Sequence, residues 1–163
     1  MPSDRDFPFA VVILAGRASG GDGDRVGEMV QSARDVGADA IVVAVPRGWR
    51  APAHARVVHV APGASPISAV RAAMAQLSNT PAPYAVLWPL DASSVDVERL
   101  RALVHDVKRE RPSLAAIEGD DLDRGPVMIA RDAWLELMTL GEHGMGAVAE
   151  RRGLRRVAVE RAT

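Results

Sequence analysis

The chain has 163 residues, of which 48% are hydrophobic and 25% charged, and its formal charge of −1 gives no general attraction to nucleic acid or anionic lipid. It has no cysteine, which excludes disulfides, thiolate metal sites and cysteine nucleophiles. The N-terminal stretch MPSDRDFPFAVVILAG has an acidic lead and a short apolar run, so it predicts a first core strand and neither a signal peptide nor a membrane span. We therefore expect one cytoplasmic domain over residues 1–163, with no nucleic acid or membrane partner.

Short β-branched runs alternate with segments of helical period along the chain, which is typical of βαβ units. Several runs are nearly all apolar, as strands buried on both faces of a parallel sheet should be. The predicted strands are Phe9–Leu14, Ala40–Val45, Arg56–Val60, Tyr84–Trp88, Leu114–Ile117, Val127–Ala130 and Arg155–Val159. The pattern predicts an α/β fold with a mostly parallel sheet that is covered by helices on both faces.

Apolar residues at steps of three and four positions predict five helices, around residues 26–36, 67–77, 97–107, 134–137 and 145–151. Gly37 follows the first helix where a C-cap would lie, and Ser65 with Pro66 can cap and open the second. On the third helix we expect Asp106 on the outer face together with Lys108, which is the only lysine in the chain.

The glycine-rich segment after Leu14 is a candidate phosphate loop, because ligands of open parallel sheets bind beyond the carboxyl ends of the strands. Backbone amides and a helix N-terminus could approach a phosphate there. The glycines are spaced G-x-G-x-x-x-G, no Gly-Lys-Ser/Thr follows, and two aspartates would repel a phosphate without a divalent metal. A phosphate loop and a flexible surface loop are therefore both open interpretations.

Asp91 follows a buried strand and precedes a helix, which places it at the same edge of the predicted sheet. A carboxylate there can hold Mg²⁺, which prefers one or two carboxylates plus substrate phosphates. The alternative is that the aspartate or a following serine only caps the next helix. Ser65 and Ser68 could bind a nucleobase or ribose, although Ser65 also suits an N-cap, and the backbone around Gly63 is a further candidate.

The other polar side chains match neither a histidine metal site nor a serine-hydrolase motif. The four histidines lack metal-ligand spacing, and no G-x-S-x-G elbow supports a serine hydrolase. The arginines between residues 151 and 156 form a local basic run, which usually marks a solvated face.

Four stretches, in their order and spacing, carry a resemblance that covers nearly the whole chain. They are the Leu14-Ala15-Gly16 turn with Arg25-Val26-Gly27, then GASPISAVRAAMAQL, then YAVLWPLDASSVDVERLRALV, and finally RGPVMIARDAWLELMTLGEHGMGAVAER. They resemble, respectively, the phosphate signature, the base-enclosing turn and helix, the strand with a metal-binding aspartate, and the acceptor-closing segment of one family. This family is the MobA-like group of molybdenum-cofactor nucleotidylyltransferases.

The resemblance implies a three-layer α/β/α sandwich with a Rossmann-like sheet of the nucleotide-diphospho-sugar transferase type, and an NTP bound with Mg²⁺. It implies phosphate contacts from Leu14, Ala15, Gly16 and Arg17, base contacts from Gly63, Ser65 and Ser68, catalytic roles for Arg25 and Asp91, and metal ligation by Asp91 and Glu142. The implied reaction is transfer of a nucleotidyl group to a phosphorylated or hydroxylated small molecule, such as a cofactor precursor in molybdenum cofactor biosynthesis.

Departures from the family pattern keep other functions open. Val30 stands where the signature calls for lysine, and the first helix begins at once, although Arg17 or Arg25 could compensate. Glu142 replaces the usual aspartate, and the histidine before Pro126 is gone. A degenerate member that binds or assembles with a partner, as a homo- or hetero-oligomer, and a glycosyltransferase-like domain that binds a nucleotide sugar are the alternatives.

Overall fold

The computed structural model describes residues 7–16, 22–50, 54–61, 65–90, 97–140 and 144–159. These residues form a seven-stranded sheet in the order β3-β2-β1-β4-β6-β5-β7. The strands are β1 (Phe9–Leu14), β2 (Ala40–Pro46), β3 (Arg56–Val60), β4 (Tyr84–Pro89), β5 (Leu114–Ile117), β6 (Val127–Ala130) and β7 (Arg155–Val157). Within this sheet only β6 runs against the other strands, because it pairs antiparallel with both β4 and β5. The predicted, mostly parallel sheet is confirmed.

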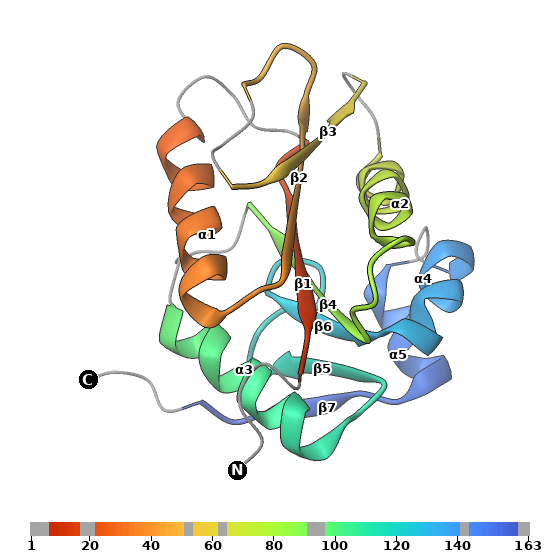
Figure 1. The fold of residues 1–163 in the computed structure, drawn as a ribbon. Helices are drawn as coiled ribbons and strands as arrows, with labels where there is room; N and C mark the ends of the chain where they lie inside the picture. The colour runs from red at the N-terminus through yellow and green to blue at the C-terminus, as the bar shows by residue number, and fades with distance from the viewer. Residues whose placement is uncertain are drawn as a thin grey trace.

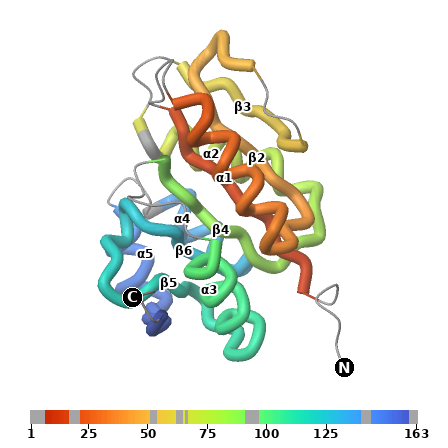
Figure 2. Tube along the Cα trace, turned by 90° about the vertical axis from the view of Figure 1, so that its left-hand side faces the viewer, coloured from red at the N-terminus to blue at the C-terminus, as the bar shows by residue number. Residues whose placement is uncertain are grey.

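Helices cover both faces of the sheet. They are α1 (Gly23–Val36), α2 (Pro66–Leu77), α3 (Val97–Glu110), α4 (Trp134–Leu140) and α5 (Met145–Arg152), with a 3₁₀ turn at Arg131–Ala133 before α4. Figure 1 shows α1 and α3 on one side of the sheet and α2, α4 and α5 on the other. The view of Figure 2 places α1 and α3 in front of the strands. The predicted three-layer α/β/α sandwich is therefore confirmed.

The apolar strands are explained by two core layers, one on each face of the sheet. In β1, Val11 and Ile13 pack toward α1 and α3, whereas Ala10 and Val12 pack toward α2. Both kinds of position are fully buried, so the strand has no polar alternation. No helix of the described residues is long and apolar enough to cross a membrane.

The predicted helix signals act as expected. Gly37 ends α1 in the left-handed conformation, with φ of 96°, and its N–H donates to main-chain carbonyls of the last turn. Ser65 caps α2, and its Oγ accepts from the N–H of Ser68 at 3.4 Å. β7 ends at Val157, earlier than predicted, because its partner β5 is only four residues long and offers no position beyond Ile117.

Asp106 does not lie on an outer face, and that prediction was wrong. The residue is only 8% exposed. Its carboxylate accepts from Arg155 Nε at 2.6 Å and Nη2 at 3.1 Å, and from Arg109 Nη2 at 3.2 Å. The pKa of Asp106 is lowered, first by the hydrogen bond from Arg155 and then by the positive charges of both arginines, which together outweigh burial. Arg152 also forms an ion pair, with Asp132 at 3.0 Å. Part of the C-terminal basic run therefore pairs with acidic side chains of other elements.

We expect Asp106→Asn to lower the thermal unfolding midpoint at neutral pH by several degrees, because one charge-assisted partner of Arg155 is lost. The lowered pKa means that the carboxylate stabilises the fold above the unfolded-state value of 3.8, and that this stability is lost as the pH falls through the folded-state pKa. The midpoints of wild type and variant should therefore differ at neutral pH, begin to approach each other near pH 3.8, and meet only at a pH below the lowered folded-state pKa. The exposed Asp35→Asn serves as control, and a gap that is independent of pH would contradict the assignment.

Candidate functional site

The strand order reverses between β1 and β4. The chain leaves β1 toward β2 and β3 on one side and returns to β4 on the other. The two strands end level, because Leu14 lies opposite Pro89 and the N–H of Leu90 donates to the carbonyl of Leu14 at 3.0 Å. Ligands of open α/β sheets bind at such a switch point, outside the carboxyl ends of the strands.

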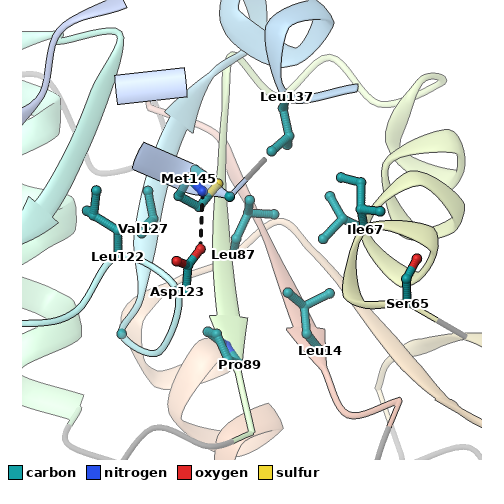
Figure 3. A pocket seen from close by; sticks show the side chains of 13 residues that line it. Leu14, Ser65, Ile67, Leu87, Pro89, Leu122, Asp123, Val127, Leu137 and Met145 are labelled. Atoms are coloured by element: carbon teal, nitrogen blue, oxygen red, sulfur yellow. Dashed lines mark hydrogen bonds between the residues drawn. The ribbon is translucent and has the colours of Figure 1, made fainter. Parts of the chain in front are cut away.

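A cavity of about 470 Å³ lies at this edge, on the side of the sheet that α2 covers. Small-molecule sites of roughly 300–1,000 Å³ are typical. Figure 3 shows its walls: Leu14 and Pro89 at the ends of β1 and β4, Ser65 and Ile67 at the start of α2, and side chains from the 122–127 segment, α4 and α5 opposite. Most of the lining is apolar, and its charged side chain is the carboxylate of Asp123.

The structure brings only some of the predicted site residues to this cavity. Leu14 and Ser65 line it, and Ser68 contacts Ser65, with the two hydroxyl oxygens 2.9 Å apart. Arg25 lies in the first turn of α1, which covers the other face of the sheet. Four predicted residues lie outside the described part of the chain, so their roles stay predictions: Arg17, Gly63, Asp91 and Glu142.

The turn after Leu14 is closely packed. Ala15 is buried, and its N–H donates to the carbonyl of Ala44 in β2 at 2.8 Å. A Cβ at Gly16 would lie 3.1 Å from Val60 Cγ2, so this glycine lets the turn approach β3. The backbone thus leaves the sheet edge in a fixed direction just before the predicted phosphate loop.

Asp123 is a site residue that the sequence reasoning missed. It belongs to the acidic turn that follows β5, and its Oδ1 accepts from the N–H of Met145 at 3.1 Å, at the first residue of α5. Figure 3 shows this contact across the cavity wall. One signal was available: in a mostly parallel sheet the turn after β5 meets the same edge as the ends of β1 and β4.

The acidic turn is anchored on its outer side. Arg99 of α3 donates to Asp120 Oδ1 at 2.9 Å, and Arg156 of β7 donates to the carbonyl of Asp120 at 3.0 Å. A Cβ at Gly125 would lie 2.9 Å from the side chain of Asp120, so only glycine fits this approach. These contacts hold Asp123 in place at the cavity.

The described residues fit a divalent metal only in part. No group of three or more histidine, aspartate or glutamate side chains among them could hold a metal ion. Asp123 is the one carboxylate among the described lining residues, so a cation here would depend on the predicted ligands and on the phosphate and water oxygens that Mg²⁺ also takes. The predicted metal ligands, Asp91 and Glu142, lie outside the described residues.

The position at which the sequence pattern predicts the family lysine, Val30, is part of the core. Val30 is 4% exposed and packs in the layer between α1 and the sheet. Lys108 lies near the end of α3, where Arg111 donates to its carbonyl at 2.9 Å and stacks over the ring of Phe7, just before β1. That is the amino edge of the sheet, opposite the cavity, so Lys108 does not replace the missing lysine.

Comparison with known proteins assigns the family. The model of the MobA-like NTP transferase domain matches residues 11–160, and the chain belongs to this family. No curated protein sequence is significantly similar to the chain.

Solved structures share the fold. Rv0371c from Mycobacterium tuberculosis H37Rv has a TM-score of 0.75 at 21% identity, over 96% of this chain and 90% of that one. Its complex with manganese gives 0.72 at 24% identity over the same shares. The 2-C-methyl-D-erythritol 4-phosphate cytidylyltransferase from Thermus thermophilus gives 0.63 at 17% identity, over 92% of this chain and 88% of that one.

Two glycines at the start of α5 provide a matched test of the cavity wall. Gly144 has φ of 90° and ψ of 167°, a conformation open essentially to glycine alone, so Gly144→Ala should destabilise the protein by about 1–3 kcal/mol. Gly146 lies within α5, and a Cβ added to it would meet no atom within 4 Å, so Gly146→Ala should stabilise the protein by about 0.5–1 kcal/mol. Urea unfolding measures both, and equal effects of the two substitutions would contradict the described geometry.

Restoring the family lysine should fail. Val30→Lys would bury an unpaired ammonium in the core, and we expect a loss of several kcal/mol of unfolding free energy and no gain in nucleotide affinity. Gln31→Lys, one residue on and exposed, should change stability by less than about 0.5 kcal/mol. A stable Val30→Lys protein with tighter nucleotide binding would overturn this account of α1.

Proposed function

We propose that the protein binds a nucleoside triphosphate with a divalent cation at the carboxyl edge of β1 and β4 and transfers its nucleotidyl group to a small acceptor. The observation that carries this proposal is the cavity at the switch point of a chain that belongs to the MobA-like NTP transferase family. Leu14, Pro89 and the start of α2 all line it.

The proposed reaction would need little covalent chemistry from the protein itself. An acceptor oxygen attacks the α-phosphorus, the bond to the bridging oxygen breaks, and pyrophosphate leaves. Rate enhancement then rests on alignment and on neutralising the charge that develops on the phosphates. A bound divalent cation supplies much of that neutralisation.

The proposed roles follow the order of the chain. The backbone from Leu14 to Gly16, with Arg17 and Arg25, would contact phosphate, and Gly63, Ser65 and Ser68 would lie near the base. Asp91 would hold the cation, with Glu142 as a second ligand. Magnesium suits such oxygen ligands, and the manganese complex of the structurally similar Rv0371c motivates a test of both ions.

Nucleotide binding without transfer is the second candidate function. Val30 is a core residue where the family has lysine, and α1 begins at Gly23, directly after the glycine-rich loop. Loss of such a phosphate contact can lower the catalytic rate about 10²–10³-fold. Under this alternative the protein would be a binding or assembly partner that has kept the fold.

Calorimetric titration with CTP, GTP and ATP, each with Mg²⁺ and with Mn²⁺, tests the shared binding step. We expect saturable binding of at least one nucleotide only when the cation is present, and an affinity at least about tenfold weaker in Asp91→Ala. Asp35→Asn, on the surface of α1, should bind as wild type does. Absence of binding to all three nucleotides would refute both candidate functions.

Pyrophosphate release separates the two candidates. A protein that binds nucleotide and releases pyrophosphate in the presence of a panel of phosphorylated and hydroxylated acceptors is a transferase. Binding with no release above the rate in buffer supports the second candidate.

A further inference from the structure

The lining of the apolar cavity indicates the chemical class of the acceptor, and this inference rests on the proposed function. Opposite the start of α2, its walls are Leu122, Asp123 and Val127 from the segment before and in β6, Leu137 from α4, and Met145 from α5. These residues come from the part of the chain that follows the nucleotide elements. They form a site with an apolar body and one negative charge.

The charge at this site opposes a phosphate. No lysine, arginine or histidine of the described residues lines the cavity. Arg71, the arginine of α2, directs Nε and Nη2 to the carbonyl of Met138 at 3.2 and 2.9 Å, so it ties α2 to α4. Asp123 is exposed in the free protein, so water screens its charge until a ligand covers it. A phosphate ester that covers it would meet a like charge, and no cationic side chain among the described lining residues offsets the repulsion.

The same carboxylate suits a neutral hydroxyl group. Asp123 Oδ1 accepts from Met145, whereas Oδ2 has no donor among the described residues. An ionised carboxylate is an acceptor only, so Oδ2 can receive the proton of an alcohol. The apolar residues around it favour a carbon skeleton over a second charged group.

We propose that the acceptor is a phosphate-free molecule that presents a hydroxyl group to Asp123 and buries an apolar body against Leu122, Leu137 and Met145. In the transfer step the hydroxyl oxygen forms a bond to the α-phosphorus, pyrophosphate leaves with the electrons of the broken bond, and the hydroxyl proton passes to Asp123. The product is a phosphodiester in which one phosphate joins the nucleoside to the alcohol.

Matched probes test this chemistry without knowledge of the natural acceptor. Cyclohexylmethanol and cyclohexylmethyl phosphate share one apolar body, and their binding can be followed through the amide shifts of Gly125 and Gly144, at the cavity wall. We expect the alcohol to bind about tenfold or more tightly than the phosphate ester. Asp123→Asn should narrow this ratio about tenfold, because asparagine keeps an oxygen for Met145 and removes the charge.

Asp35→Asn, on the opposite face of the sheet, should leave the ratio unchanged, and circular dichroism checks that both variants fold. Tighter binding of the phosphate ester, an unchanged ratio in Asp123→Asn, or no amide shift with either probe would overturn the proposal. These probes contain no nucleotide, so the result is separate from the calorimetric test. An alcohol that binds here while no nucleotide binds would refute the proposed transfer and leave the ligand class of the cavity standing.

Discussion

The parallel pairing of β1 with β4 is the constraint on which the rest of the site depends. It joins a strand from the first βα unit to one that follows two further strands and a helix, and it sets their ends level. In the strand order, β2 and β3 lie on the outer side of β1, and β6 and β5 lie on the outer side of β4, which is the arrangement that leaves room for a ligand between the two strand ends. The start of α2 and the segment before β6 then close around that gap and form the cavity.

The packing of α1 limits which of its side chains could contact a phosphate. Its buried stripe includes Val26, Met29 and Val30, which seal one face of the sheet. A side chain in this stripe cannot also reach a ligand on the opposite face. Val30, at the predicted lysine position, is part of this core. Under the proposed function, positive charge for a triphosphate would therefore come from a cation or from arginines outside this stripe.

Most of the fold could be predicted from the sequence because its signals are local. β1, β3, β5 and β6 have the predicted bounds, since each is a short apolar or β-branched run between helical segments or turns. Gly37 and Ser65 cap their helices through contacts with the adjacent turn, so their roles could also be predicted from the sequence.

The site was less predictable because its contacts are distant in sequence. Asp106 lies on a polar stretch of α3, and only its approach to Arg155, 49 residues away, makes it a buried partner. Asp123 and Met145 are 22 residues apart in the sequence, and no motif at either position predicts their hydrogen bond. Periodicity reports which side of a helix is apolar, but it does not report which charged group will lie opposite it.

Several of these long-range contacts use arginine. Nineteen of the twenty basic residues are arginine, and a guanidinium can donate through two nitrogens at once. Arg155 does so to both oxygens of Asp106, and Arg71 does so to the carbonyl of Met138. These bidentate hydrogen bonds connect α3 to β7 and α2 to α4. A hydrogen bond from Arg99 to Asp120 holds the turn that carries Asp123. In the described part of the chain no arginine lines the cavity, although Arg71 and Arg99 hold elements that surround it. Under the proposed function, the charge of a triphosphate at this edge would therefore be offset mainly by a bound cation.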